Sequence, residues 1–266
     1  MDTIRIGSLN TQNSKTNRTG GITSDGKDNS KILAEHIEDS GYYFLGTQEL
    51  TRVFSKNLLS HLKKYKLYGN YRYGSSKLVQ NINILDSFNE NNSIITSGQV
   101  LKTTTNLLPW FPNNPKALFE SLKNASIMPR IVTIVEIYDP KIGTIYALNT
   151  HLDYQLKSVQ IRQLKRLYEI LKILSKKYPI VLTGDFNMEL EKDPHFDDFI
   201  NKLENIGIKR VPMNEPTFIS KDNTKKTIDH IFIPKEWAIQ KTGLIEDKLL
   251  DSVTDHKGVY VDIKVK

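Results

Sequence analysis

Cysteine is absent from the 266 residues of the sequence. Its absence excludes disulfide bonds, thiolate zinc sites and a cysteine nucleophile. The sequence also lacks an apolar run long enough to span a bilayer, and it lacks the basic region and apolar core of an N-terminal secretory signal. We therefore expect no integral membrane segment and a cytoplasmic protein, although secretion after removal of an earlier leader would leave the same sequence.

No linker, internal repeat or low-complexity tract divides the chain, and we predict one domain over residues 1–266. Hydrophobic residues make up 38% of the sequence and aromatic residues 9%, which is typical of a globular protein and argues against disorder.

The formal net charge of +7 favours anionic partners, such as a phosphorylated substrate and possibly nucleic acid. The lysines are spread along the chain, with only short clusters such as Lys63-Lys64 and Lys225-Lys226. Most of them are therefore expected to form a solvated surface, and the charge supports an anionic substrate only weakly.

Hydrophobic periodicity predicts a chain that mixes strands and helices. Residues 4–10 alternate as a strand does, and the apolar residues of 157–177 recur at helical spacing. Further strands are predicted over residues 43–49, 67–73, 82–85, 93–96, 130–138, 144–149, 180–184, 227–233 and 258–265, and further helices over residues 32–41, 54–62 and 194–203. Residues 11–29 are predicted to be a long polar loop, and residues 98–127 an irregular, proline-containing one.

The segment Ile180–Asn187 carries the strongest single indication of a site. An apolar, β-branched run, typical of a strand buried on both faces, stops at Gly184, and a carboxylate and a carboxamide follow at Asp185 and Asn187. Alone, this octapeptide fits a turn or a helix cap as well as it fits an open site at a sheet edge.

Similar polar residues end six strand-like segments, and together they are hard to attribute to turn chemistry. The six clusters are Asn10, Glu49, His151 with Asp153, Asp185 with Asn187, Asp229 with His230, and Asp255 with His256. A sheet that places strand ends together forms a crevice, so we expect these side chains to converge on one site.

The chemistry of this set suits a metal ion that prefers oxygen ligands. Carboxylates and amides without thiolates favour Mg²⁺ or Mn²⁺ over structural zinc. Hydrolysis of a phosphate ester uses a divalent cation together with carboxylates and imidazoles.

The clusters also occur in the order of a known family. The motifs are Leu9-Asn10, Gln48-Glu49, Asn149-Thr150-His151-Leu152-Asp153, Thr183-Gly184-Asp185-Phe186-Asn187, Ile228-Asp229-His230-Ile231-Phe232 and Thr254-Asp255-His256. In this order the sequence resembles the endonuclease/exonuclease/phosphatase superfamily, which includes the deoxyribonuclease I-like nucleases. The resemblance implies an α/β fold, a four-layer α/β sandwich with two mixed β-sheets packed face to face and helices on the outside. It places the active site at one end of the sheets.

The resemblance also implies site residues of three kinds. The implied metal ligands are Glu49, Asn10 and Asp255. The implied catalytic residues are His256, Asp185, Asn187, His151 and Asp229. The implied substrate-binding residues are Asp153 and Arg130.

Individual roles follow from the same resemblance. His256 would lie by the scissile phosphate with Asp229 orienting it, and Asp185 would position or deprotonate the attacking water. Asn187 would hold that water or a phosphate oxygen, and His151 would bind the phosphate and donate a proton to the leaving group.

Two departures from the family pattern narrow the branch. Relatives specialised for abasic-site DNA carry tyrosine where this chain has His151, and an acidic residue where it has Gln12 and Asn13, so abasic-site repair is not expected. The secreted sphingomyelinase branch would be expected to carry a signal peptide, which is absent here.

We therefore predict Mg²⁺-dependent hydrolysis of phosphate ester bonds by in-line attack of water, without a covalent intermediate. A nuclease or phosphodiesterase is the first interpretation. A phosphatase acting on a small phosphorylated metabolite or a lipid headgroup is the alternative, and a catalytically silent binding module on the same fold is the third.

Overall fold

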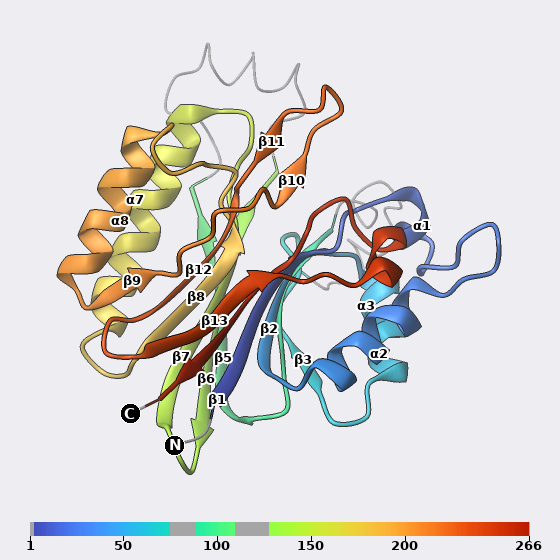
Figure 1. The fold of residues 1–266 in the computed structure, drawn as a ribbon, viewed down its shortest axis with the longest axis horizontal. Helices are drawn as coiled ribbons and strands as arrows, with labels where there is room; N and C mark the ends of the chain where they lie inside the picture. The colour runs from blue at the N-terminus through green and yellow to red at the C-terminus, as the bar shows by residue number, and fades with distance from the viewer. Residues whose placement is uncertain (1–2, 75–88, 110–127, 266) are drawn as a thin grey trace.

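Two six-stranded sheets pack face to face in the computed structural model, which describes residues 3–74, 89–109 and 128–265 (Figure 1). The strands of the first sheet are, in spatial order, β13 (Ala238–Leu244), β14 (Val259–Lys264), β1 (Thr3–Asn10), β2 (Tyr42–Leu50), β4 (Asn91–Thr96) and β3 (Lys66–Tyr68). Those of the second sheet are β5 (Gln99–Leu108), β6 (Arg130–Asp139), β7 (Gly143–His151), β8 (Ile180–Asp185), β12 (Asp229–Pro234) and β9 (Ile208–Arg210). A separate short hairpin joins β10 (Phe218–Ile219) to β11 (Lys225–Lys226).

Both sheets are mixed in the same way. The first contains one parallel pair, β1 with β2, and the second contains one parallel pair, β7 with β8. The neighbours of these pairs, including β14 beside β1 and β12 beside β8, run antiparallel. The carboxyl ends of the parallel strands and the first residues of β12 and β14 therefore lie at the same edge.

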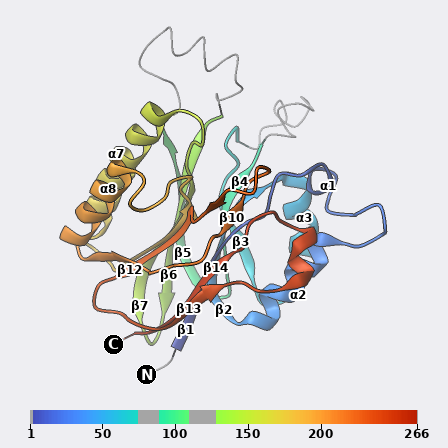
Figure 2. The same cartoon turned by 45° about the horizontal axis from the view of Figure 1, so that its top comes forward.

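Helices cover the outer faces of the sheets. Helices α2 (Asn29–Ser40) and α3 (Arg52–His61), with a 3-10 helix at Lys248–Ser252, pack on the first sheet, whereas α7 (Lys157–Leu174) and α8 (Pro194–Asn205) pack on the second. The two groups stay on opposite flanks when the molecule is turned (Figure 2). A short helix, α1 (Lys15–Arg18), lies in the segment before α2.

Three apolar clusters confirm the four-layer α/β sandwich. The middle one, between the two sheets, contains Phe44, Val135, Val181 and Val261. Each outer cluster buries one face of a sheet against amphipathic helices, as Leu167 of α7 does. Fully burying one such leucine or valine side chain contributes about 1.5–3 kcal/mol.

Polar side chains also lie between the sheets, near the edge where the parallel strands end. Asn149 of β7 donates from Nδ2 to the carbonyl oxygens of Thr47 and Ser93, both at 2.8 Å, and Gln48 Nε2 donates to Asn149 Oδ1 at 2.6 Å. These buried bonds tie β7 of one sheet to β2 and β4 of the other, directly behind the predicted site.

Most of the predicted elements are confirmed, and the exceptions are at exposed edges. The prediction that residues 98–127 are irregular is wrong for β5, an edge strand with three successive threonines and no regular apolar alternation. The strand predicted over residues 67–73 covers only Lys66–Tyr68, and β9, β13 and the β10–β11 hairpin were not expected. Residues 11–29 contain α1 in addition to loop. The strand predicted at residues 82–85 lies outside the described residues.

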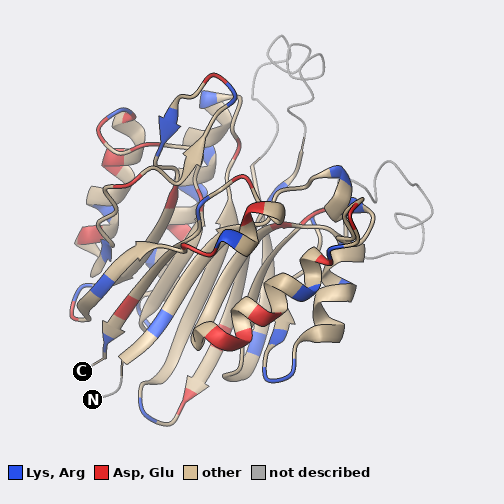
Figure 3. Ribbon diagram, turned by 45° about the vertical axis from the view of Figure 1, so that its right-hand side comes forward, with Lys and Arg blue, Asp and Glu red and all other residues tan. Residues whose placement is uncertain are grey.

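Charged residues of both signs are interspersed over the outer helices and loops (Figure 3). Over the described ranges, no helix combines the length and the apolar character needed to cross a membrane.

Candidate active site

The strand order brings the predicted site residues to one edge of the sandwich. Asn10, His151 and Asp185 are the last residues of β1, β7 and β8, and Glu49 is the last but one of β2. These four residues come from the two parallel pairs, one in each sheet, so the site spans both sheets.

Asp229 and His256 lie at the same edge, but at the starts of strands and not at their ends. The expectation that all six clusters follow strands is wrong for these two: Asp229 is the first residue of β12, where it pairs with Asp185, and His256 precedes β14. Both strands run antiparallel to their neighbours in the site, so they begin where those neighbours end.

The backbone is held in an unusual conformation at three places in the site. Gln12, Glu49 and Asn187 have positive φ angles of 50°, 62° and 52°. Residues other than glycine rarely adopt a positive φ angle, and such backbone conformations cluster at functional sites. At Glu49 the positive φ angle coincides with a register shift between β2 and β4 after Thr47.

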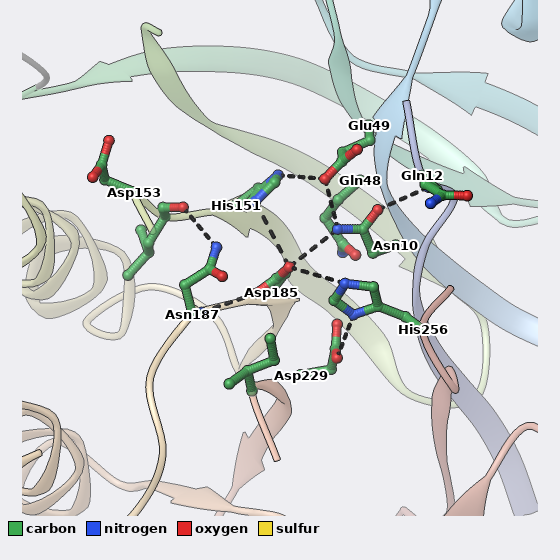
Figure 4. A network of polar contacts seen from close by, with 12 residues as sticks. Asn10, Gln12, Gln48, Glu49, His151, Asp153, Asp185, Asn187, Asp229 and His256 are labelled. Atoms are coloured by element: carbon green, nitrogen blue, oxygen red, sulfur yellow. Dashed lines mark hydrogen bonds and ion pairs between the residues drawn. The ribbon is translucent and has the colours of Figure 1, made fainter. Parts of the chain in front are cut away.

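Asn10 connects the two sheets within the site (Figure 4). Its Nδ2 donates to Glu49 Oε1 at 3.0 Å and to Asp185 Oδ2 at 3.1 Å, and its Oδ1 accepts from the Gln12 backbone N–H at 2.9 Å. The carboxamide is therefore fixed in orientation, and it holds two carboxylates of different sheets near each other.

His256 forms a buried pair with Asp229. Its Nδ1 lies 2.9 Å from Asp229 Oδ2, and its Nε2 lies 3.8 Å from Asp185 Oδ2. Burial opposes the charged imidazole, but the charge and hydrogen bond of Asp229, with the charge of Asp185, outweigh burial and raise the pKa of His256 to about 10. The ring of Phe218 packs against His256 with 4.8 Å between centroids. His256 is thus an imidazolium near neutral pH, with Nε2 facing Asp185.

His151 lies on the other side of Asp185 and has the opposite charge preference. Its Nε2 is 3.6 Å from Asp185 Oδ2, and its Nδ1 is 3.9 Å from Glu49 Oε1. Burial, the charge of Arg130 and then the charge of Arg72 lower the pKa of His151 well below its usual value. The free site therefore holds one cationic and one neutral imidazole.

Asp185 lies between the two histidines, and burial and the charge of Asp229 raise its pKa. Its Oδ1 accepts from the Asn187 backbone N–H at 2.9 Å. A carboxylate whose proton affinity is raised in this way is suited to accept a proton from water.

Two further predicted residues, Asn187 and Arg130, lie near this cluster. Asn187 donates from Nδ2 to the Leu152 carbonyl at 3.1 Å and stays next to Asp185. Arg130 is buried at the start of β6, close enough to affect the pKa of His151.

Asp153 is not brought into the cluster. Its Oδ1 accepts from the backbone N–H groups of Gln155 and Leu156 at 2.9 and 2.8 Å, at the start of α7. In Figure 4 its carboxylate points away from Asp185. These contacts are those of a residue that organises the turn into the helix.

Two donor groups could hold a divalent cation. The first is Glu49, 22% exposed, with Asn10 beside it. Burial, and less strongly the negative charge of Glu49, raise the pKa of exposed Asp255, although the charge of His256 lowers it. Such crowding of negative charge is relieved by a cation, and oxygen donors of this kind fit Mg²⁺ or Mn²⁺.

The second group contains Asp185, Asp229 and His256, whose ligand atoms lie within 4.8 Å of one another in the described part of the chain. A protonated imidazole cannot ligate a metal, and Asp229 already neutralises the charge of His256. The Glu49 side therefore fits a cation better.

Several residues that support the site were not found from the sequence. Thr254 Oγ1 donates to the Asn10 carbonyl and accepts from the His256 backbone N–H, and Thr217 Oγ1 accepts from the Asp229 backbone N–H at 3.2 Å. Arg72 and Glu90 form a buried ion pair nearby. Only Thr254, inside a recognised motif, had a signal that could have been used.

The sequence is similar to a described protein family. The model of a family described as "Endonuclease/Exonuclease/phosphatase family" matches residues 7–256. No curated protein matches the chain.

Three solved structures with the same fold belong to proteins that are described differently. An endonuclease/exonuclease/phosphatase family protein from Bacteroides thetaiotaomicron is 19% identical with a TM-score of 0.76, over 100% of this chain and 98% of that one. A mannosyl-6-phosphatase of the same organism is 20% identical with a TM-score of 0.74, over 98% and 99%. TDP2 of D. rerio, complexed with a single-strand DNA product, is 14% identical with a TM-score of 0.67, over 99% and 100%.

Proposed function

Because the chain belongs to the endonuclease/exonuclease/phosphatase family, we propose that it hydrolyses a phosphate ester bond with the help of Mg²⁺ or Mn²⁺, as a nuclease or phosphodiesterase. The observation that carries the proposal is the arrangement of two imidazoles of different charge around Asp185. Nε2 of cationic His256 and Nε2 of neutral His151 lie 3.8 and 3.6 Å from the same carboxylate oxygen.

Each group around Asp185 has a part in in-line attack by water. Asp185 accepts the proton of the attacking water as the bond from the water oxygen to phosphorus forms. The His256 imidazolium, held by Asp229, donates a hydrogen bond to a phosphoryl oxygen whose negative charge grows in the transition state. The carboxamide of Asn187, beside Asp185, orients the water or a phosphate oxygen.

His151 acts on the leaving group. The negative charge of a bound phosphate raises the pKa of this imidazole, which can then supply a proton to the ester oxygen as its bond to phosphorus breaks. His151 Nδ1 and Asp229 Oδ1 are buried and have no hydrogen-bond partner among the described residues. Such atoms support the binding of a further group at this site.

A divalent cation held by Glu49 and Asn10, with Asp255, would supply positive charge to the phosphoryl oxygens. The oxygen donors and the crowded negative charge of this side of the site support that assignment.

A phosphatase acting on a small phosphorylated metabolite or a lipid headgroup is the second candidate. The similarity in fold to a mannosyl-6-phosphatase, over nearly the whole of both chains, supports it. Lysine and arginine are spread along the sequence, and they are interspersed with aspartate and glutamate in the view of Figure 3, which agrees with a small substrate.

The test is hydrolysis of four substrates by purified protein in Mg²⁺ or Mn²⁺, with EDTA as the metal control. Plasmid DNA, single-stranded RNA, bis(4-nitrophenyl) phosphate and 4-nitrophenyl phosphate are assayed in parallel. Metal-dependent cleavage of nucleic acid or the diester supports the nuclease or phosphodiesterase, and turnover of the monoester alone supports the phosphatase. Binding of substrate without hydrolysis under any condition would contradict both and support a silent binding module.

A further inference from the structure

A buried ion pair lies next to the site and is not used by the mechanism above. The guanidinium of Arg72 contacts the carboxylate of Glu90, and the two side chains are only 5% and 9% exposed. The Arg72 backbone N–H also donates to the Glu90 carbonyl at 3.0 Å. A buried ion pair is weak evidence for stability, because desolvation offsets its attraction, so a functional reason for this pair is worth seeking.

Glu90 is connected to the proposed metal side of the site through one residue. Asn13 donates from Nδ2 to Glu90 Oε1 at 2.5 Å, and its backbone N–H donates to Glu49 Oε2 at 2.6 Å. Arg72, Glu90, Asn13 and Glu49 are therefore joined in one hydrogen-bonded chain.

A second guanidinium lies in the same region. Arg130 is 4% exposed, and its Nε has no hydrogen-bond partner in the parts of the chain that the structure describes. Asn92, two residues after Glu90, donates from Nδ2 to the carbonyl of Ile131, the residue after Arg130, at 3.0 Å. Val132 of the same strand pairs with Thr150, the residue before His151. Strand pairing therefore brings the segments that carry Arg72 and Arg130 to the His151 side of the site. Glu90 neutralises one of the two guanidiniums.

The excess positive charge beside His151 is suited to binding an anion. Buried charges are costly unless they are paired, and a guanidinium matches the oxygens of phosphate with a fork of N–H groups. An anion that enters beside His151 would compensate the charge of Arg130. The guanidinium of Arg72 has five N–H donors, so it can bind the same anion while it remains paired with Glu90.

We propose that Arg72, positioned by Glu90, binds phosphate oxygens of the substrate beside His151 together with Arg130. This inference rests on the proposed phosphoesterase function. It assigns a substrate-binding role to a residue outside the motifs that define the site, and it makes Glu90 a positioning residue.

The test compares Arg72 with an arginine that has a similar partner elsewhere. Arg5 forms a two-bond pair with Asp262, at 2.7 and 2.8 Å, near the opposite end of β1 from Asn10. Arg72→Gln, Arg72→Lys and the double variant Arg72→Gln with Glu90→Gln are compared with Arg5→Gln. The double variant leaves no unpaired buried carboxylate, which protects folding.

Two measurements are made on each variant. The dissociation constant of inorganic phosphate is measured by ³¹P NMR in EDTA, and kcat and KM are measured separately with the best substrate of the panel. We expect Arg72→Gln and the double variant to weaken phosphate binding and raise KM by roughly 10- to 100-fold, the value of hydrogen bonds to a charged group. Arg72→Lys should lie between them and the wild type, and Arg5→Gln should change neither quantity.

The outcomes separate this inference from the proposed function. Unchanged phosphate binding and KM in both Arg72→Gln and the double variant would overturn the inference, as would a wild type that binds no phosphate. If the wild type hydrolyses nothing, the proposed function fails, but loss of phosphate binding in the Arg72 variants would still support the anion site.

Discussion

The two imidazoles of the site differ in protonation because their neighbours differ. His256 has Asp229 at hydrogen-bonding distance, whereas His151 is buried near two arginines. Because both imidazoles lie within 4 Å of Asp185, small changes in these neighbours should change the chemistry of the site.

Asp229→Asn is expected to remove the charge that keeps His256 protonated. The pKa of His256 should fall from about 10, because burial is then opposed only by the charges of Asp185 and Asp255. We expect kcat to fall roughly 10²- to 10⁴-fold, the usual contribution of a positioned acid or base. NMR titration of the His256 ring protons checks the pKa, and a pKa that stays above 9 would contradict the account.

His230→Gln is expected to flatten the dependence of stability on pH in mild acid. Burial lowers the pKa of His230 to about 4, and its Nε2 lies 3.0 Å from the Met188 carbonyl, a bond that glutamine can also make. The unfolded chain binds the proton near the ordinary pKa of about 6.5. The contribution of His230 is therefore present above pH 6.5 and is lost as the pH falls from 6.5 to 4.

Urea unfolding at several pH values measures this effect. In that window the free energy of unfolding of the wild type should fall by about 1 kcal/mol per pH unit more than that of His230→Gln. Equal slopes for the two proteins would contradict the assignment.

The sequence identified the acids and imidazoles of the centre because each follows or precedes an apolar strand in a recognised motif. It missed Arg72 and Glu90, which lie on two separate segments that are joined by the bridge between Tyr71 and Asn91 and by the bond from the Arg72 backbone N–H to the Glu90 carbonyl. Asp153, which was predicted to bind substrate, lies outside the cluster at the start of α7, because the sequence does not distinguish a carboxylate that bonds to the first turn of a helix from one that faces the site.

Elements with a strong hydrophobic period were predicted well, and exposed edge strands were not. In α7 the apolar stripe is the buried face, so the period and the structure agree. In β5 and β13 one face is solvated and the sequence is mainly polar, so their strand character depends on pairing with β6 and β14.

Asn149→Ala is expected to weaken both stability and activity. It leaves the buried carbonyls of Thr47 and Ser93 without their donors, which should cost about 2–4 kcal/mol in the free energy of unfolding. Because Thr47 lies two residues before Glu49, kcat/KM should also fall.

Leu167→Ala provides the matched control for Asn149→Ala. Leu167 is fully buried on the inner face of α7, and its truncation should cost about 2–5 kcal/mol while kcat/KM of the folded protein stays unchanged. Equal effects of the two variants on kcat/KM would show that Asn149 supports only the fold.

At the scale of the whole molecule, the site depends on the two sheets staying face to face, since each supplies part of it. Asn10, Glu49 and His256 come from the first sheet, and His151, Asp185 and Asp229 from the second. This arrangement was predicted only through the family resemblance, because periodicity indicates strands but not which sheet each strand joins.

We expect the chain to unfold as one domain. The apolar cluster between the sheets includes Trp237 and residues of both sheets, so neither sheet can lose its core alone. Urea transitions followed by far-ultraviolet circular dichroism and by tryptophan fluorescence should coincide. Two separated transitions would contradict the prediction of a single domain over residues 1–266.

The most direct test of the central claim is metal-dependent hydrolysis of bis(4-nitrophenyl) phosphate by the wild type, His256→Ala and His36→Gln. His36 is the matched control, because its Nδ1 lies 3.0 Å from Asp247 Oδ2, as a histidine–aspartate pair away from the site. We expect EDTA-sensitive turnover by the wild type and His36→Gln, and a loss of at least roughly 10²-fold in His256→Ala. Turnover by His256→Ala equal to that of the wild type, or insensitive to EDTA, would contradict the account.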